Sequence, residues 1–512
     1  MKNKIFNAIF TFAILAALVI FLAGVAVFLQ VNSSLIGYFP LMVTVVCLIF
    51  ATSIVCGILF YKKEANKGVK ISAFILIGIT LIAMILIILF CMVIDFFQPL
   101  TLTSIGNGLI FAGLGITVGA SVLYIIFTKK YILPMVACVC VCCCLITGVI
   151  WANAQPYQKF SEKVTVKELF VNGEGGYATF RIPSLLSLDK DVLNKSNERI
   201  YTEDVLVAMA EARKDGSQDI GEIDLVYKLS FDSGKTWSDL KILIDIDEKG
   251  KVGNPTIGFD KNTAKLVMLY LVGTEKSGYN YLTYAIRGEF NHIYGFDFDE
   301  PTLITKEYDE NAGTGKHDGV TQYTIMAGPG KIVQTKSGRL VAPCSNAGFS
   351  YAAYSDDGGY TWIRGESEIA GNECEIAILN DSTLVMVSRD NANCAGVHNE
   401  QYVRLAYSYD NGQSWQDLTE CKNLKTPICM SSIVRLSENK IALTFPDDFY
   451  MRTDLTIAIS NDGGKTFTKE KLYDGASGYS CVETNGEGKI FVIAEIGKVN
   501  YNETISFFEY VG

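Results

Sequence analysis

Hydrophobic residues follow two different patterns along the chain. Up to Trp151 they form five nearly continuous apolar runs, at 5–28, 39–60, 71–94, 107–127 and 131–151. Each run has at least about twenty residues, which is enough for a helix to cross a hydrocarbon core of roughly 30 Å. The sequence therefore predicts a bundle of about five transmembrane helices over 1–151, followed by a linker over 152–163.

The lysine residues predict how such a bundle would be oriented. Lys2, Lys4 and the lysines of 62–70 and 129–130 fall on one side if the runs alternate, and the opposite loops carry no Lys or Arg. By the positive-inside rule the N-terminus is then cytoplasmic, in a multi-pass protein of the cell membrane whose remaining chain is extracytoplasmic. The runs contain almost no charge, so the default interpretation is an anchor with membrane lipid as its partner. A sensor or partner-binding bundle stays open.

Beyond the linker the pattern changes to a period of two with frequent Gly, Asn and Asp, as in 204–210, 265–270 and 440–445. This alternation predicts an all-β domain over 164–512. One octapeptide returns four times, at 230–237 (SFDSGKTW), 355–362 (SDDGGYTW), 408–415 (SYDNGQSW) and 460–467 (SNDGGKTF). We expect each copy to be a structural turn, with Asp accepting backbone N–H bonds and Gly at positive φ. The repetition favours a β-propeller over a sandwich.

Charge divides the chain at the same point. The whole chain has 44 Lys and Arg and 54 Asp and Glu. Eight lysines and two acids lie up to Trp151, which leaves 36 basic and 52 acidic residues beyond it, a net charge of −16. A domain of this charge does not predict nucleic-acid binding. His292, His317 and His398 do not cluster at ligand spacing, so the sequence predicts no metal and no cofactor.

The segment 180–183 (FRIP), followed by the four octapeptides, resembles the exo-α-sialidase (neuraminidase) family of the bacterial type. The resemblance covers the chain from about 164 to 512. It implies a six-bladed β-propeller whose octapeptide turns lie far from the active site. In this chain the propeller would follow the N-terminal multi-span membrane region.

Sialic acid carries a carboxylate on its anomeric carbon, and planar bidentate donors suit that group, so arginine is favoured over lysine. The resemblance implies three arginines on this carboxylate, matching Arg181, Arg389 and Arg452. Arg404 and Arg435 lie in the same half of the chain and are open alternatives to Arg452.

The nucleophile implied by the resemblance is a neutral tyrosine, matching Tyr479, because a carboxylate would be repelled by the substrate's own charge. A tyrosine with an ordinary pKa near 10 needs a base within reach. Glu373 matches that base. Glu375 is a rival that strand alternation cannot separate from it.

A general acid should lie on a loop. Asp219 fits the loop that follows Arg213, and the resemblance favours it over its competitor, Asp215. Arg213 matches the family's fourth arginine, which helps to bind the sugar. Glu495 matches the acid that orients the first arginine.

The resulting hypothesis is a retaining exo-α-sialidase that hydrolyses terminal sialic acids of glycoconjugates through a tyrosyl-sialosyl intermediate. Its partners would be sialylated glycans or glycolipids. Two alternatives stay open: a trans-sialidase, in which another hydroxyl replaces water, and a catalytically inactive propeller that binds sialoglycans.

Overall fold

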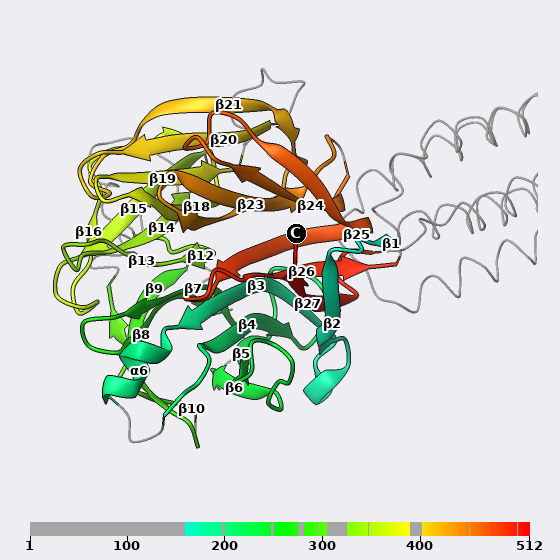
Figure 1. Ribbon diagram of the computed structural model, residues 1–512. Helices are drawn as coiled ribbons and strands as arrows, with labels where there is room; N and C mark the ends of the chain where they lie inside the picture. The colour runs from blue at the N-terminus through cyan, green and yellow to red at the C-terminus, as the bar shows by residue number, and fades with distance from the viewer. Residues whose placement is uncertain are drawn as a thin grey trace, which may run out of the picture. The chain divides into compact units, whose positions relative to one another are not determined.

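The fold is built almost entirely from β-strands (Figure 1). The computed structural model describes residues 159–512, apart from 197–199, 247–249, 275–280, 294, 305–324, 347, 390–401, 450 and 499. Within this part of the chain the helical elements are α6 (Lys190–Ser196) and the 3-10 turn η2 (Glu174–Gly176). Residues Pro156–Gly512 form one compact unit. The prediction of an all-β domain is confirmed.

The prediction of a transmembrane bundle, and with it of a multi-pass protein of the cell membrane, is contradicted. No helix among the described residues is long enough and apolar enough to cross a bilayer. The five predicted spans themselves lie outside those residues. The prediction rested on the length of the apolar runs, and length alone does not say what an apolar run packs against.

Ten strands from the first half of the described chain form one sheet. Its main path is β10–β9–β8–β7–β5–β4–β3, while β6 pairs with β5, β11 with β9 and β12 with β7. A parallel contact between Ile223 and Lys251 joins β5 to β7 and so merges two groups of strands. The strands are β3 (Thr179–Leu188), β4 (Val205–Arg213), β5 (Ile223–Ser230), β6 (Lys241–Ile244), β7 (Gly250–Asp260), β8 (Lys265–Thr274), β9 (Leu282–Asn291), β10 (Gly295–Phe298), β11 (Thr302–Leu303) and β12 (Gly330–Lys331).

An eight-stranded sheet combines strands from both ends of this unit. Its path is β2–β27–β26–β25–β24–β23–β22, and β1 pairs with β25. The C-terminal strand therefore lies beside one of the first strands, which ties the two ends together. The strands are β1 (Lys159–Phe160), β2 (Val164–Val171), β22 (Ser432–Ser437), β23 (Lys440–Pro446), β24 (Thr453–Ser460), β25 (Thr468–Thr484), β26 (Ile490–Gly497) and β27 (Thr504–Tyr510).

Two smaller sheets come from the middle of the chain. The five-stranded sheet contains β13 (Val333–Gln334), β14 (Leu340–Asn346), β15 (Phe349–Ser355), β16 (Ile363–Arg364) and β17 (Ile369–Ala370). The four-stranded sheet contains β18 (Cys374–Asn380), β19 (Thr383–Ser388), β20 (Tyr402–Ser408) and β21 (Gln416–Lys425). Both are antiparallel throughout their described ladders.

The prediction of a six-bladed β-propeller preceded by a helical bundle is wrong. The described strands form four sheets, of eight, ten, five and four strands, instead of six separate blades. Strand β25 gives one reason, because it has 17 residues and pairs with β24 over its first part and with β26 over its last. The octapeptides, 52 to 53 residues apart in the second half, locate hairpins. They carry no information on whether the flanking strands also pair with the next group.

The four octapeptides are structural turns, as predicted. In the first, the Gly234 N–H donates to Ser230 Oγ and the Thr236 N–H donates to Asp232 Oδ1, both at 2.8 Å. Gly234 has a φ of 85°, and a Cβ at this position would collide with the ring of Phe507 on β27. The other three copies repeat both hydrogen bonds. Each turn therefore closes a hairpin, and the first also packs one sheet against another.

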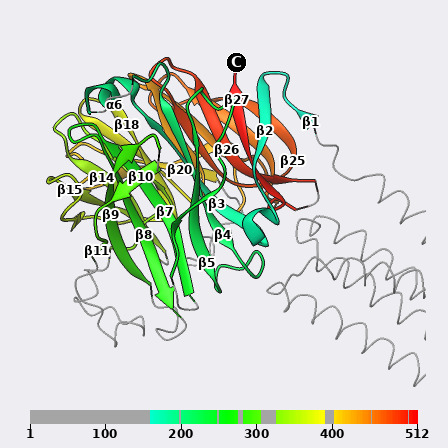
Figure 2. The same cartoon turned by 90° about the horizontal axis from the view of Figure 1, so that it is seen from below.

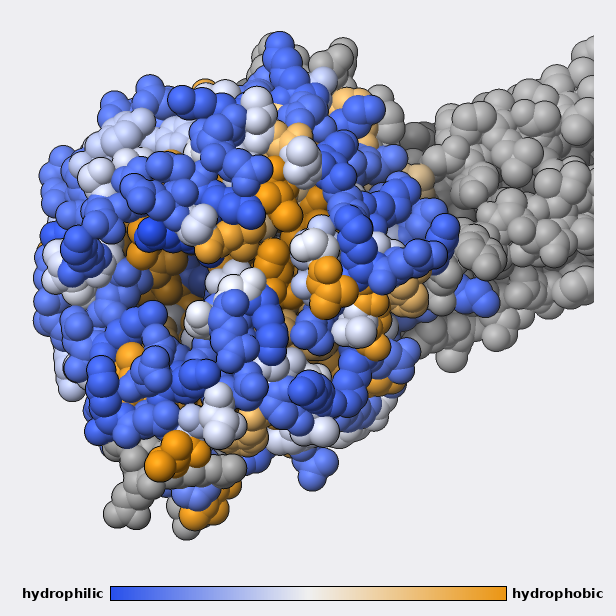
Figure 3. Space-filling model, viewed as in Figure 1, coloured by the Kyte–Doolittle hydropathy of each residue, from blue (hydrophilic) through white to orange (hydrophobic). Residues whose placement is uncertain are grey.

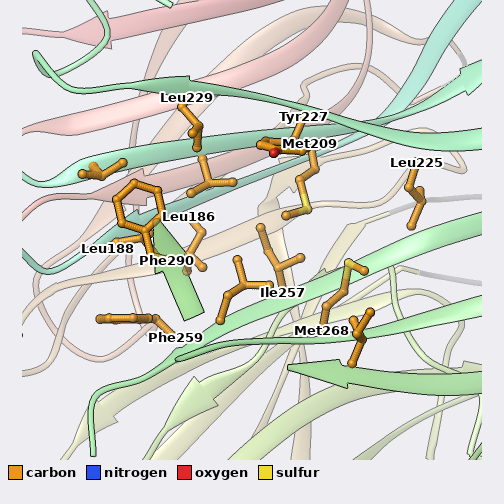
Figure 4. Close-up of a cluster of buried hydrophobic side chains, with 14 of the residues drawn as sticks. Leu186, Leu188, Met209, Leu225, Tyr227, Leu229, Ile257, Phe259, Met268 and Phe290 are labelled. Carbon is orange, nitrogen blue, oxygen red and sulfur yellow. The ribbon is translucent and has the colours of Figure 1, made fainter. Parts of the chain in front are cut away.

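Buried apolar side chains fill the space between strand groups. Figure 4 shows the largest such cluster, in which Leu186 and Met209 of β3 and β4 face Ile257 and Met268 of β7 and β8. A second cluster joins β3, β4 and β5 to β26 and β27. Strand β3 consequently lies beside β25 and β26 (Figure 1 and Figure 2). This packing brings residues about 300 positions apart to the same place.

The surface drawn in Figure 3 is polar over most of its area, with a hollow in its middle where apolar residues are visible. The hollow lies where Figure 1 draws the short strand β12 between the larger sheets.

Candidate active site

Tyr479 lies at the centre of a group of charged side chains. It belongs to β25, whose register with β26 shifts between Ser477 and Ser480. The Tyr479 hydroxyl donates to the carboxylate of Glu373, with distances of 2.7 and 2.5 Å to its two oxygens. Arg389 donates from Nη1 to the same hydroxyl at 2.9 Å and also pairs with Glu373. Side chains from three separate segments of the chain, just before β18, just after β19 and within β25, thus meet at one phenol oxygen.

The surroundings of Tyr479 keep its phenol neutral. Ile182, Cys429 and Met430 pack around it in a small apolar cluster. Burial, followed by the negative charge of Glu373, raises the pKa of Tyr479 well above its ordinary value. The positive charges of Arg389 and Arg452 act in the opposite direction but do not outweigh them. The tyrosine can become a nucleophile only as its proton leaves, and Glu373 is placed to take it.

Glu373 and Glu375, the two candidates for the base, lie on either side of the residue at which β18 begins. Glu373 precedes β18, whereas Glu375 is its second residue and is completely buried. Glu375 accepts the Ile433 N–H at 2.8 Å and the hydroxyl of Ser432, and it lies 3.9 Å from the ammonium of Lys331. Of the two carboxylates, Glu373 is therefore the one in contact with Tyr479.

Arg181 is held by the buried carboxylate of Glu495 on β26. Its Nε and Nη2 donate to the two carboxylate oxygens at 3.0 and 3.3 Å, a bidentate arrangement. Glu495 also accepts the backbone N–H of Tyr479 at 3.1 Å. Burial acts against the charge of Arg181, but Glu495 together with Tyr501, Asp219 and Tyr479 outweighs it, so the pKa of the guanidinium is raised well above its ordinary value. One carboxylate therefore fixes both the first arginine and the tyrosine.

The Arg-Ile-Pro segment bends the strand at this point. Ile182 has a φ of 56°, which is unusual for a β-branched residue, and the register of β3 with β4 shifts between Arg181 and Ser184. The Ile182 N–H donates to Glu495 Oε1 at 2.9 Å. Strain of this kind persists where the surroundings hold the backbone, and here Glu495 does so.

Arg452 also lies close to Tyr479. Its Nη2 donates to the carbonyl of Ile428 at 2.9 Å, and its guanidinium carbon lies 5.2 Å from the ring centre of Tyr479. Arg404, one of its sequence alternatives, instead donates to the carbonyl of Ala370 at 3.0 Å. Arg435, the other alternative, lies on β22. The fold thus brings Arg181, Arg389 and Arg452 together around Tyr479.

Arg213 and Asp219 form the second end of the site. Arg213 Nη2 lies 2.9 Å from Asp219 Oδ1, and Arg181 Nη1 lies 3.6 Å from the same oxygen. The Asp219 side chain is 73% exposed, whereas that of Arg213 is only 1% exposed. Although its side chain is largely exposed, neighbouring protein atoms displace part of the water around Asp219 and so act to raise its pKa. The charges of Arg213, Arg181 and Lys251 outweigh this loss of hydration and lower the pKa to about 2.

Two acids near Asp219 have different surroundings. Asp215, its competitor, is exposed in the same loop. Asp224 accepts the hydroxyl of Tyr177 at 2.7 Å and lies 3.3 Å from the ammonium of Lys214. Asp219 is therefore the acid of this loop that touches the arginines.

A second buried carboxylate, Glu211, was not identified from the sequence. Its Oε2 accepts Arg213 Nη2 at 2.5 Å, while its Oε1 accepts the Asn254 N–H at 3.0 Å and lies 3.4 Å from Lys251 Nζ. Burial opposes its charge, but Lys251, Arg213 and the Asn254 N–H lower the pKa of Glu211. Asn254 resembles Ile182, because it has a φ of 53° and also precedes a proline. The shared X-Pro pattern is the signal that could have linked Glu211 to Glu495.

Comparison with known proteins gives a consistent result. The BNR repeat-like domain matches residues 203–492, more than half of the chain. The chain belongs to this family. Its relatives include a sialidase from Micromonospora viridifaciens, 26% identical over 371 residues, which cover 65% of this chain and 52% of the relative. The chain thus spans about half the length of that protein.

The comparisons do not support the predicted bacterial type, because the relatives also include an animal protein. Sialidase-3 of Mus musculus is 24% identical over 315 residues, which cover 54% of this chain and 68% of the mouse protein. Among solved structures, Trypanosoma rangeli sialidase in complex with sialic acid has a TM-score of 0.53 at 20% identity, covering 69% of this chain and 60% of that one. That likeness supports the fold. At the level of the family, this BNR-repeat chain is sialidase-like.

Proposed function

We propose that this chain is a retaining exo-α-sialidase that hydrolyses terminal sialic acids of glycoconjugates, with residues 164–512 as its catalytic domain. The observation that carries the proposal is the contact of the Tyr479 hydroxyl with Glu373, next to Arg389 and within reach of Arg181 and Arg452. A neutral phenol paired with a base, among several permanent cations, suits an anomeric centre that bears a carboxylate.

In the proposed reaction the arginines Arg181, Arg389 and Arg452 bind the sugar carboxylate, and Glu495 orients the first of them. Tyr479 Oη attacks the anomeric carbon as its proton passes to Glu373. The bond to the leaving oxygen breaks as that oxygen takes a proton from Asp219. Arg213 binds the far side of the ring.

The second step reverses the roles. A water molecule gives a proton to Asp219 and attacks the anomeric carbon, and the bond to Tyr479 breaks. The phenol recovers its proton from Glu373. Two displacements at one carbon retain the configuration, and both acids return to their starting states.

The proposal is tested by incubating the protein with a fluorogenic α-sialoside and following the product by proton NMR. Release of the fluorophore, with α-sialic acid as the first sugar product, supports a retaining sialidase. Initial release of the β-anomer contradicts retention. No release by wild-type protein that still binds sialic acid would indicate a sialoglycan-binding protein. Adding lactose to the same assay separates hydrolysis from transfer to a second sugar.

A further inference from the structure

A second tyrosine lies against the same two arginines as Tyr479. The guanidinium carbon of Arg181 is 5.3 Å from the ring centre of Tyr501, and that of Arg452 is 5.0 Å from it. The corresponding distances to the ring of Tyr479 are 5.4 and 5.2 Å. All four lie within the range of cation–π attraction. Two guanidiniums are thus in contact with two aromatic rings.

Tyr501 differs from Tyr479 in its partners. The hydroxyl of Tyr479 donates to the carboxylate of Glu373. The ring of Tyr501 instead packs on Gly478, where an added Cβ would approach its Cδ2 to 2.7 Å. The second tyrosine therefore touches the backbone immediately before the nucleophile proposed above.

The turn that carries Tyr501 is fixed from both sides. Glu503 accepts the N–H of Asn500 at 2.8 Å and that of Lys498 at 2.9 Å. The carbonyl of Asn502 accepts the Thr179 hydroxyl at 3.0 Å and the Asn172 amide at 2.9 Å. Thr179 begins β3, the strand that carries Arg181. These hydrogen bonds connect the turn of Tyr501 to the strand of Arg181 and so fix the position of the ring relative to this arginine.

Two like charges held close together repel each other, and Arg181 accordingly acts to lower the pKa of Arg452. Arg181 is anchored bidentately by Glu495, but the hydrogen bond of Arg452 goes to the neutral carbonyl of Ile428. The negative faces of the two tyrosine rings offset this repulsion before a ligand arrives. Tyr479 is also the nucleophile of the proposed reaction, whereas Tyr501 takes no part in its bond-making steps.

We propose that Tyr501 is a positioning residue that keeps Arg181 and Arg452 together, so that they accept a substrate carboxylate without rearrangement. The inference rests on the proposed function and adds a determinant of carboxylate recognition to it. Because the aromatic ring, and not the hydroxyl, attracts the two guanidiniums, Tyr501→Phe should behave like the wild type. Tyr501→Leu and Tyr501→Met, which lack a ring, should bind the carboxylate more weakly.

The test compares two ligands, a 2,3-unsaturated sialic acid analogue and its methyl ester, by calorimetry. Tyr501→Leu is expected to weaken binding of the acid about tenfold and that of the ester less than about twofold. KM for a fluorogenic sialoside should rise by a similar factor, with kcat changed less. Tyr409→Leu, which removes an exposed tyrosine that contacts Asp417, is the matched control and should change neither.

A merely structural role of Tyr501 would weaken acid and ester equally, and that result overturns the inference, as does Tyr501→Phe behaving like Tyr501→Leu. If Tyr501→Leu fails to fold, Tyr501→Met gives the same comparison with a side chain that fills more of the space. Wild-type protein that binds neither ligand nor cleaves the sialoside overturns the proposed function as well, so the two failures are distinguishable.

Discussion

The two ends of the site, one around Tyr479 and one around Asp219, share the same supporting contacts but differ in exposure and in charge. At each end a buried glutamate binds an arginine and the N–H of a residue before proline, with Glu495 serving Arg181 and Ile182, and Glu211 serving Arg213 and Asn254. Glu495 takes the backbone of Tyr479 as its third partner, whereas Glu211 takes the ammonium of Lys251.

The two ends also differ in how far they are exposed. The Tyr479 end is buried, and the Tyr479 hydroxyl is in contact with the carboxylate of Glu373. The Asp219 end is exposed, and its acid is an ion paired with cations. In the proposed reaction, Tyr479 is thus already paired with the group that would take its proton, whereas Asp219 has to gain a proton before it can act as an acid. Mutations at the two ends, and changes of pH, should therefore affect the reaction differently.

The largest expected effect is at the buried end. Tyr479→Phe removes the oxygen that attacks the anomeric carbon, so kcat should fall by about 10³-fold or more on every sialoside, whatever its leaving group. The fall is measured with a fluorogenic sialoside and with a sialyl-lactose. Binding of free sialic acid should stay within about threefold of wild type, because the arginines are kept. Substantial turnover by this variant would contradict the assignment of Tyr479.

A smaller and selective effect is expected at the exposed end. Asp219→Asn removes the proton donor, which matters only where the leaving oxygen needs a proton. A sialyl-lactose should be cleaved about 10² to 10⁴ times more slowly, and a nitrophenyl sialoside less than about tenfold more slowly. The two rates are measured side by side.

The matched control is Asp215→Asn, an exposed acid of the same loop. It should leave both substrates within about twofold of wild type. If Asp219→Asn slows both substrates equally, Asp219 is not a general acid and contributes only charge or loop structure.

The side chains named from the sequence lie near one another in the structure, although their roles stay predictions, whereas the architecture predicted to carry them is wrong. Arg181, Arg213, Glu373, Arg389, Arg452 and Tyr479 lie on or next to strands of three different sheets. Sheet architecture was less accessible, because the pairing of Ile223 with Lys251 joins strands that no local pattern links. The repeated turns marked the hairpins correctly, yet the number of sheets depends on long-range pairing such as that of β25.

Residues that act through other residues were also missed. Glu211 lies two positions before Arg213, but a glutamate beside an arginine is common on any strand. Lys251 and Tyr501 lie near the site only because β7 and the turn after β26 pack there. The choice between Glu373 and Glu375 likewise depended on where β18 begins. Such positions are set by the backbone path, which residue type alone does not specify.

The smallest expected effect concerns the protonation of Asp219. Its pKa is about 2, because the charges of Arg213, Arg181 and Lys251 outweigh its partial loss of hydration. A substrate carboxylate bound to Arg181 brings a negative charge close to Asp219, and a like charge disfavours the ionised form, so this pKa must rise on binding. Free-enzyme pKa values govern kcat/KM, and those of the complex govern kcat. The alkaline fall of kcat should therefore lie at least about one pH unit above that of kcat/KM.

Lys251→Met tests the cause of this gap. Loss of one cation raises the pKa of free Asp219, so the alkaline fall of kcat/KM should move upward by about half a pH unit or less, since an exposed carboxylate is screened by solvent. The shift should shrink further at 1 M salt. Lys336→Met, which removes an exposed lysine paired with Asp381, is the control. A downward shift in the Lys251 variant would contradict the role of Lys251 in lowering the pKa of Asp219. Falls of kcat and kcat/KM at the same pH in wild type would contradict a rise of this pKa on substrate binding.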